Sequence, residues 1–560
     1  MPKSRLFFAA LTLAALMAKG ASAAPAEPAP TPKLIVAIAV DQFSGNLFDA
    51  WRGRFTGGFK RLAGGVVYPS GYQTHAATET CPGHSTLLTG KHPSKTGIIA
   101  NAFRDEATGR TVYCLNDPGM VLAHDPKAAP VSPKRLMAST LGEWLKAASP
   151  QSRVVAVSGK DRAAINMAGH NADGTFWLVE GYGFTTYMTP GADAAKALAP
   201  VAGYNASIAK VWKTRPKWTY AHADCRASAA TWTIGGKAWE SKLPPAGWGE
   251  SDAPATIKAN VMTSPMADEI TGDAARHLVK TLKLGQGPAT DLLAVSFSAT
   301  DFIGHRYGSR GPEMCEQMHR LDETLGRLFA DLDKLHVPYL VVLSADHGGS
   351  DFAERLQAQG YPMARRVNSG EVMGRVNQAL MTEFNLAKPP LQGNVEESNI
   401  VGVPEADKAR VAEAAARILA AQPEVAAAFT QTELLAVIVR KGVPPDELTI
   451  KERFAESIYA GRSPDVLAAL QPESTLVPGI PGQLLASHGT VWDYDRRVPM
   501  LFWWPGAVGE TRFLPVETVD IAPTLAGALK LTPPADVDGR CLKLPASSGV
   551  QCGTGGGPGG

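Results

Sequence analysis

The sequence lacks any concentration of charge. Its 560 residues carry 55 Lys and Arg against 53 Asp and Glu, which gives a formal net charge of +2, and no long run of Lys or Arg occurs. A nucleic-acid backbone is held by a concentrated basic field, so nucleic-acid binding by bulk charge is not expected. The apolar share of 45% and the charged share of 19% exclude disorder over most of the chain.

Long apolar runs and internal repeats are also lacking. After the N-terminus no stretch reaches the roughly 20 apolar residues that a membrane span needs, and we find no repeat of fixed period. The N-terminus has a basic start, an apolar run at 6–17 and small residues up to Ala23. This order favours an export signal at 1–23 over a membrane anchor. We expect a Pro/Ala-rich linker at 24–32 and a soluble mature protein, periplasmic or secreted.

Cysteine is scarce, and no pair has zinc-ribbon spacing. The six residues are Cys81, Cys114, Cys225, Cys315, Cys541 and Cys552. An oxidising compartment permits disulfides, but six cysteines leave several pairings open. The short spacing favours a local pair between Cys541 and Cys552, and Cys81 is expected to be buried or disulfide-bonded. Residues 546–560 are predicted to form a flexible Gly-rich tail.

Apolar runs and helical patterns alternate along the chain. This order predicts an α/β fold with a mostly parallel central sheet and helices on both faces. We expect one catalytic domain at 33–545, with cap insertions at about 163–260 and 351–480. The predicted parallel strands are 34–40, 154–157, 292–297, 339–343 and 500–504, and the predicted helices include 133–146, 314–335 and 405–429.

Polar residues follow the predicted strands, where the carboxyl ends of parallel strands share one edge of the sheet. Asp301 and His305 are four residues apart, so they share one face of a helical turn and can bind one metal ion. Asp346 and His347 directly follow an apolar strand. Each pair alone is more often a solvated surface pair. Two such pairs at successive strand ends favour a metal site.

Two further residues complete this set. Asp41 ends the first strand, and His488 lies in a loop of small residues. Alone, His488 is more often a structural hydrogen-bonding residue. Together the three Asp and three His match what two zinc ions need when each keeps an open position for substrate.

Thr80 is the candidate nucleophile. Pro82 suits the first turn of a helix, which places Thr80 at or near its N-cap, where backbone N–H groups are free. A threonine there is usually only a cap. Beside two metal ions, its hydroxyl becomes able to attack phosphorus at neutral pH.

The order of these residues resembles the alkaline phosphatase superfamily, most closely its bacterial threonine-nucleophile phosphatases of the PafA type. The resemblance covers nearly the whole mature chain. It implies two Zn²⁺ ions and a phosphothreonine intermediate at Thr80. One ion would take Asp301, His305 and His488, and the other Asp41, Asp346, His347 and the Thr80 oxygen. It also implies that Asn101, Lys160 and Arg162 bind the oxygens of the phosphoryl group.

The resemblance implies an exported phosphomonoesterase of broad specificity that acts on small phosphate esters. A phosphodiesterase or nucleotide pyrophosphatase is the alternative. Relatives of that kind lack the cationic pair Lys160 and Arg162, from which a dianionic monoester gains more than a diester does. A metal- or phosphate-binding protein without turnover is disfavoured because every residue needed for chemistry is present. A sulfatase needs Cys-x-Pro-x-Arg, which Cys81 and its neighbours do not match. Nothing in the sequence indicates an oligomeric state.

Overall fold

The computed structural model describes residues 30–105, 107–481 and 483–553. The predicted export signal at 1–23, most of the linker at 24–32 and the end of the tail at 554–560 therefore lie outside the described residues. Within the described part of the chain, no helix combines the length and the apolar character of a membrane span.

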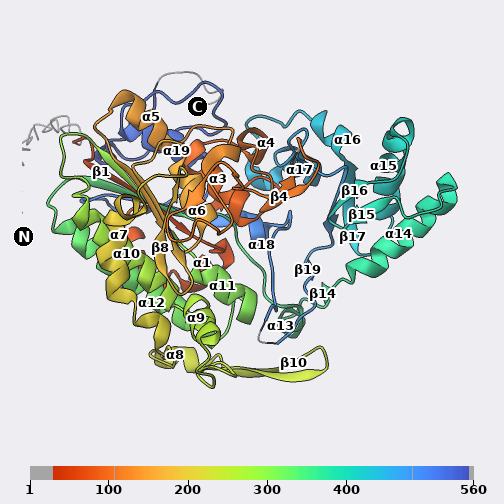
Figure 1. Ribbon diagram of the computed structural model, residues 1–560, viewed down its shortest axis with the longest axis horizontal. Helices are drawn as coiled ribbons and strands as arrows, with labels where there is room; N and C mark the ends of the chain where they lie inside the picture. Colours follow the sequence, from red (N-terminus) through yellow and green to blue (C-terminus); the bar gives the residue numbers. More distant parts are fainter. Residues whose placement is uncertain (1–29, 106, 482, 554–560) are drawn as a thin grey trace, which may run out of the picture.

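A ten-stranded sheet forms the centre of the molecule (Figure 1). Strand β1 pairs in parallel with β12 and β13, and β12 pairs in parallel with β6. The predicted α/β class with a mostly parallel sheet is confirmed. The strands are β1 (Leu34–Val40), β2 (Val66–Tyr72), β6 (Val154–Ser158), β7 (Gly174–Val179), β8 (Gly183–Thr185), β12 (Asp291–Phe297), β13 (Tyr339–Ser344), β20 (Arg497–Trp503), β21 (Glu510–Thr511) and β22 (Val516–Glu517).

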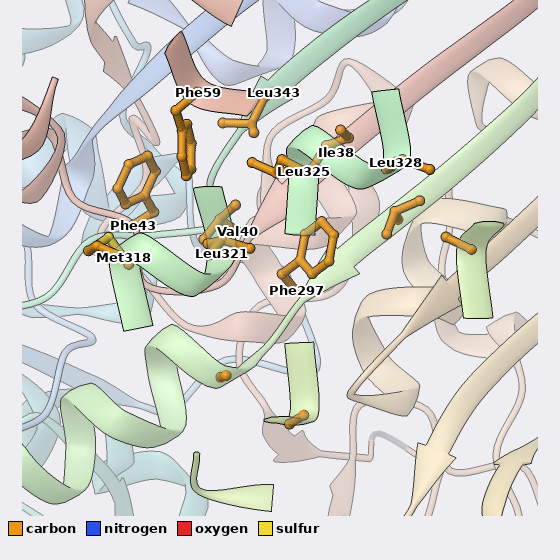
Figure 2. Packing of buried hydrophobic residues seen from close by; sticks show 14 of the residues in the cluster. Ile38, Val40, Phe43, Phe59, Phe297, Met318, Leu321, Leu325, Leu328 and Leu343 are labelled. Atoms are coloured by element: carbon orange, nitrogen blue, oxygen red, sulfur yellow. The ribbon is translucent and has the colours of Figure 1, made fainter. Parts of the chain in front are cut away.

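Both faces of the sheet are buried under helices. Alternate side chains of β1 enter two different cores, with Ile38 and Val40 in one and Ile35 in the other, because successive strand residues point to opposite faces. Figure 2 shows Ile38 and Val40 packed beside Leu321 and Leu325. One face is covered mainly by α1 (Gly45–Trp51), α2 (Gly58–Leu62), α7 (Ala194–Ile208), α10 (Met266–Thr281) and α12 (Pro312–Asp333), and the other by α3 (Thr80–Thr89), α5 (Leu141–Ala148), α6 (Asp161–Ala168) and α19 (Ile521–Ala528).

Strand β20 was predicted to be parallel, and this was wrong. It pairs antiparallel with both β13 and β2. The preceding loop, which carries His488, already lies at the carboxyl edge of the parallel strands, since His488 contacts Asp301 there. A strand that starts from this edge has to run in the opposite direction. A buried apolar run does not by itself reveal strand direction.

The interval 163–260 contributes more to the sheet than a cap insertion would. Strands β7 and β8 extend the sheet beyond β6. The remainder includes a hairpin of β10 (Ala230–Ile234) and β11 (Lys237–Ser241), which projects from the bottom of the molecule in Figure 1.

Residues 351–480 build most of a separate lobe, on the right in Figure 1. The lobe has its own four-stranded sheet and its own hydrophobic core. The helix predicted at 405–429 ends at Ala420, and residues 425–430 form a strand instead, because Pro423 interrupts the helix. Its elements include α14 (Ser369–Phe384), β15 (Leu391–Gly393), β16 (Glu397–Ile400), α15 (Glu405–Ala420), β17 (Val425–Thr430), α16 (Gln431–Leu435), α17 (Ile450–Ala455) and β18 (Val466–Leu470).

Two local predictions need adjustment. The helix predicted at 133–146 is split into a short 3₁₀ turn at Pro133–Arg135 and α5, because Thr140 and Glu143 form a capping box that starts a new helix. We expected a flexible tail from residue 546, yet residues 546–553 pack onto the domain. Val550 is 9% exposed, and Cys552 forms the predicted disulfide with Cys541.

Disulfides pair all six cysteines. Besides the C-terminal pair, Cys225 joins Cys315, and Cys81 joins Cys114. The last bond ties the first turn of α3 to the end of β4 (Thr111–Tyr113). It therefore fixes the helix that begins with Thr80.

Candidate active site

Three adjacent parallel strands bring three carboxylates together at the carboxyl edge of the sheet. Asp41 follows β1 and Asp346 follows β13, while Asp301 lies in the first turn of α11 (Ala299–Tyr307), which begins just after β12. All three are buried, with at most 2% of their surface exposed. Three buried carboxylates at one place require a compensating cation.

Three histidines face these carboxylates in one common orientation. The Nδ1 atom of each donates a hydrogen bond to a backbone carbonyl oxygen, so the Nε2 atom is left for a ligand, as in metal-binding histidines. The bonds are His305 to Ala486 at 2.9 Å, His347 to Gly348 at 2.8 Å and His488 to Thr78 at 2.8 Å.

The six side chains form two neighbouring groups. We call Asp41, Asp346 and His347 the inner cluster and Asp301, His305 and His488 the outer cluster. In the inner cluster, Nε2 of His347 lies 3.3 Å from Asp346 Oδ2 and 3.5 Å from Asp41 Oδ1. Ligand atoms of these three residues lie within 4.8 Å of one another.

The outer cluster is centred on one carboxylate oxygen. Oδ1 of Asp301 lies 3.2 Å from His305 Nε2 and 3.3 Å from His488 Nε2. The rings of His347 and His488 stack with their centroids 3.6 Å apart, which places the two clusters side by side. The structure thus brings together the three Asp and the three His for which the sequence predicted a metal role; the seventh predicted ligand is the Thr80 oxygen.

The donor atoms in both clusters fit a pair of divalent cations. Within the described residues, Asp41 Oδ1, Asp301 Oδ1, Asp346 Oδ2 and His347 Nε2 are buried and have no hydrogen-bond partner. Buried polar atoms without partners are costly, so atoms that converge in this way indicate a ligand. Imidazole and carboxylate donors suit zinc.

The electrostatics of the site point to the same need for positive charge. Burial, together with the negative charge of Asp346, raises the pKa of Asp41 well above its ordinary value. Burial opposes ionisation of Asp301 as well, but Lys160 and His305 hold its pKa well below the usual value. Burial lowers the pKa of His347 to about 3, which leaves the ring neutral and able to bind a metal.

Lys160 is the cation nearest to this group of carboxylates. Its Nζ atom lies 2.6 Å from Asp41 Oδ2 and 2.5 Å from Asp301 Oδ2. The ammonium group therefore bridges the inner and the outer cluster. It neutralises part of their charge.

Thr80 is the first residue of α3, directly after the N-cap residue Glu79. Its Oγ1 atom accepts a hydrogen bond from Arg162 Nη2 at 3.4 Å. Asn101 is held close by, because its Oδ1 atom accepts a hydrogen bond from the Cys81 backbone N–H at 2.9 Å. This bond leaves the Asn101 amide N–H groups available to a ligand. Thr80, Asn101 and Arg162 thus meet beside the inner and outer clusters.

Sequence reasoning missed the residues that hold helix α3, the loop before Thr80 and the loop of Asp346 in place. The amide of Gln73 donates to the carbonyl of Ala345, next to Asp346, at 3.0 Å. Oγ of Ser457 accepts a hydrogen bond from the Ala76 backbone N–H at 2.7 Å. No sequence signal reveals the second contact, since the two residues are 381 positions apart. His84 is a third missed residue, and its position four residues after Thr80 was the available signal.

The sequence profile of the Type I phosphodiesterase / nucleotide pyrophosphatase family matches residues 35–490. The chain belongs to this family. Its predicted resemblance to the alkaline phosphatase superfamily is confirmed, and so is the prediction that it is a phosphoester-cleaving enzyme.

Among curated proteins, this family member is 40% identical to alkaline phosphatase PhoD of Zymomonas mobilis subsp. mobilis, over 95% of the chain and 92% of the relative. It is 39% identical to alkaline phosphatase PhoK of a Sphingomonas species, over 93% and 92%. The crystal structure of alkaline phosphatase PafA superposes with a TM-score of 0.79 at 26% identity, over 92% of this chain and 98% of that one. The predicted alkaline-phosphatase-like fold is confirmed.

Proposed function

We propose that the protein is an exported, zinc-dependent phosphomonoesterase of broad specificity that works through a phosphothreonine at Thr80. The observation that carries this proposal is the position of the Thr80 hydroxyl. It lies at the start of a helix, bonded to Arg162, beside the inner and outer clusters of Asp and His. The alkaline phosphatase names of the relatives support the same activity.

The two clusters would hold two zinc ions, which supply Lewis-acid stabilisation of the charge on the nucleophile, the phosphoryl oxygens and the leaving oxygen. The residues of the chain supply the rest. Oγ of Thr80 loses its proton to solvent and attacks phosphorus, and a new O–P bond forms as the ester O–P bond breaks. The leaving oxygen takes up a proton. Water then attacks the phosphothreonine, breaks its O–P bond and releases inorganic phosphate.

Three side chains would hold the phosphoryl group during both steps. The Asn101 amide and the Arg162 guanidinium can donate hydrogen bonds to its oxygens, and Lys160 adds a positive charge from the bridging position between the clusters. The equatorial oxygens carry more charge in the transition state than metal ions alone can cover. Two cations favour a dianionic monoester over a monoanionic diester. Hydrolysis of diesters is therefore expected to be the secondary reaction.

Phosphodiesterase activity is the second candidate function, because the matching family profile bears that description. A monoester and a diester with the same leaving group distinguish the two candidates. A larger kcat/KM for the monoester supports our proposal, and a larger value for the diester overturns it.

The nucleophile is tested by Thr80→Ala and Thr80→Ser. We expect Thr80→Ala to lose at least about 10³-fold in kcat while it keeps its zinc, since only the attacking oxygen is removed. Thr80→Ser should retain measurable activity. Acid quenching and mass spectrometry should detect phosphate on Thr80 in the wild type. Full turnover by Thr80→Ala would disprove the assignment.

Export is supported by the N-terminal sequence and by three disulfides, because disulfides persist in oxidising compartments. Fractionation of cells that produce the full chain tests this part. We expect activity in the periplasm or the medium and a mature N-terminus close to residue 24. Activity confined to the cytoplasm would contradict it.

A further inference from the structure

His84 lies in the first turns of α3, is fully buried, and has no role in the mechanism above. Its Nδ1 atom lies 2.9 Å from the backbone oxygen of Thr80 and 3.1 Å from Asp346 Oδ2. Its Nε2 atom lies 2.8 Å from Oγ of Ser296 on β12. One imidazole therefore contacts the nucleophile's own residue, a carboxylate of the inner cluster and the central sheet.

The proton on this ring has a defined position. The two oxygens beside Nδ1 are a carbonyl oxygen and a carboxylate oxygen, which accept hydrogen bonds but donate none. Nδ1 therefore carries a proton. In the neutral ring Nε2 is then an acceptor, and the Ser296 hydroxyl donates to it. The N–H group thus donates to Thr80 O, and Asp346 Oδ2 lies 3.1 Å from the same nitrogen.

The backbone segments around His84 are closely packed, which restricts the position of its ring. A Cβ atom on Gly83 would come within 1.9 Å of the Asp346 backbone oxygen, so helix α3 and the Asp346 loop are in direct contact. Gln73 bonds to both segments, through the carbonyls of Gly83 and Ala345. His84 is the residue at this contact that reaches the side chain of Asp346.

We propose that His84 is a positioning residue that couples the nucleophile to the inner metal cluster. Its Nδ1–H group donates to the backbone oxygen of Thr80 and lies 3.1 Å from Asp346 Oδ2, so it holds the first turn of the Thr80 helix and attracts this carboxylate oxygen at the same time. Apart from this 3.1 Å contact with His84 Nδ1, Asp346 Oδ2 has no hydrogen-bond partner within the described residues, and it is the oxygen that faces His347 Nε2. Orienting this oxygen prepares the site for zinc. The inference rests on the zinc dependence in the proposed function.

The test compares His84→Asn with His84→Leu in the full chain. The two replacements have nearly the same shape, but only Asn carries an N–H group that can take the place of Nδ1–H. The readout is Zn²⁺ affinity, measured by competition with a chromophoric chelator and without substrate. Ligand-orienting residues typically contribute about 10- to 100-fold to metal affinity. We expect a loss of this size for one zinc in His84→Leu and a loss of less than about threefold in His84→Asn.

Ser85→Ala is the matched control. Ser85 is the next residue of the same helix and is equally buried, but its hydroxyl bonds to Pro82 and Thr96, away from the metal ligands. It should bind zinc as the wild type does. Equal zinc affinity in His84→Leu and His84→Asn would overturn the inference, and so would an equal loss in Ser85→Ala.

If His84→Leu does not fold, Ser296→Ala tests the same contacts, because it removes the hydroxyl that holds the ring. A zinc affinity weakened by about threefold to tenfold supports the inference, and an unchanged affinity overturns it. A wild-type protein that binds no zinc and remains active would instead refute the proposed function, so the two failures are distinguishable.

Discussion

The inner and outer clusters are built from the same residue types but on different supports. Asp41, Asp346 and His347 of the inner cluster follow two central strands directly, and all three are completely buried. In the outer cluster, the side chain of His305 is 25% exposed and that of His488 is 7% exposed. His305 lies on helix α11, and His488 lies in a loop. The sheet therefore fixes the inner cluster, while the outer cluster depends on contacts made by peripheral segments.

The separate lobe supplies some of those contacts. A cavity of about 70 Å³ beside His488 is lined in part by Glu396 and Glu473. Ser457 holds the backbone at Ala76, in the loop whose Thr78 carbonyl orients His488. We therefore expect substitutions in the lobe to disturb the outer cluster more than the inner cluster.

The largest effect is expected from Asp346→Asn in the inner cluster. This variant removes a buried charge that contacts both His347 and His84. We expect kcat/KM to fall at least about 10³-fold and zinc content to fall from two ions to about one, since a neutral amide is a poor zinc ligand. Metal analysis and monoester kinetics measure both. The surface variant Asp407→Asn, in the separate lobe, should change neither.

A smaller effect is expected from His305→Ala in the outer cluster. His305 is the most exposed of the six residues, so water can take its place as a ligand. We expect zinc affinity to fall about 10- to 100-fold and activity to return when millimolar zinc is added to the assay. The comparison between the clusters fails if added zinc rescues Asp346→Asn to the same extent.

Lys160 and Arg162 differ in their relation to the two clusters, because only Lys160 contacts carboxylates of both. Both Lys160→Ala and Arg162→Ala should reduce monoester hydrolysis about tenfold more than diester hydrolysis. Without zinc, Lys160→Ala should also melt at a lower temperature than Arg162→Ala, because it leaves Asp41 and Asp301 without their neutralising cation. Thermal melts in a chelator check this. Equal melting temperatures of Lys160→Ala and Arg162→Ala would contradict the bridging role of Lys160.

The smallest effect, on stability alone, concerns Glu313 of α12, a buried carboxylate that accepts a hydrogen bond from Ser241. Burial raises the pKa of Glu313 to about 7, so the folded state holds its proton more tightly than the unfolded state. Stability is therefore lost as pH rises from about 4.5 to about 7. In Glu313→Gln, the decrease in the free energy of unfolding over this pH range should be smaller by about 1–3 kcal/mol. Denaturant unfolding at pH 5 and pH 8 measures it, and an identical pH dependence in both proteins would contradict it.

The sequence allowed site residues to be predicted where Asp or His residues follow the end of a predicted strand. Asp41 and Asp346 could be found because each directly follows an apolar run, and Asp301 with His305 because helical spacing pairs them. The direction of β20 could not be predicted, since an apolar run is the same in both directions. The pairing of Cys81 with Cys114 was also open, because only the folded chain brings β4 next to α3.

The bond between Cys81 and Cys114 anchors the residue next to the nucleophile. Such a covalent anchor cannot be completed while the chain is still in a reducing cytosol. If the chain is exported as we propose, this bond would form only after the chain has left the cytosol. The helix that carries Thr80 would then receive its covalent anchor away from the phosphate esters inside the producing cell.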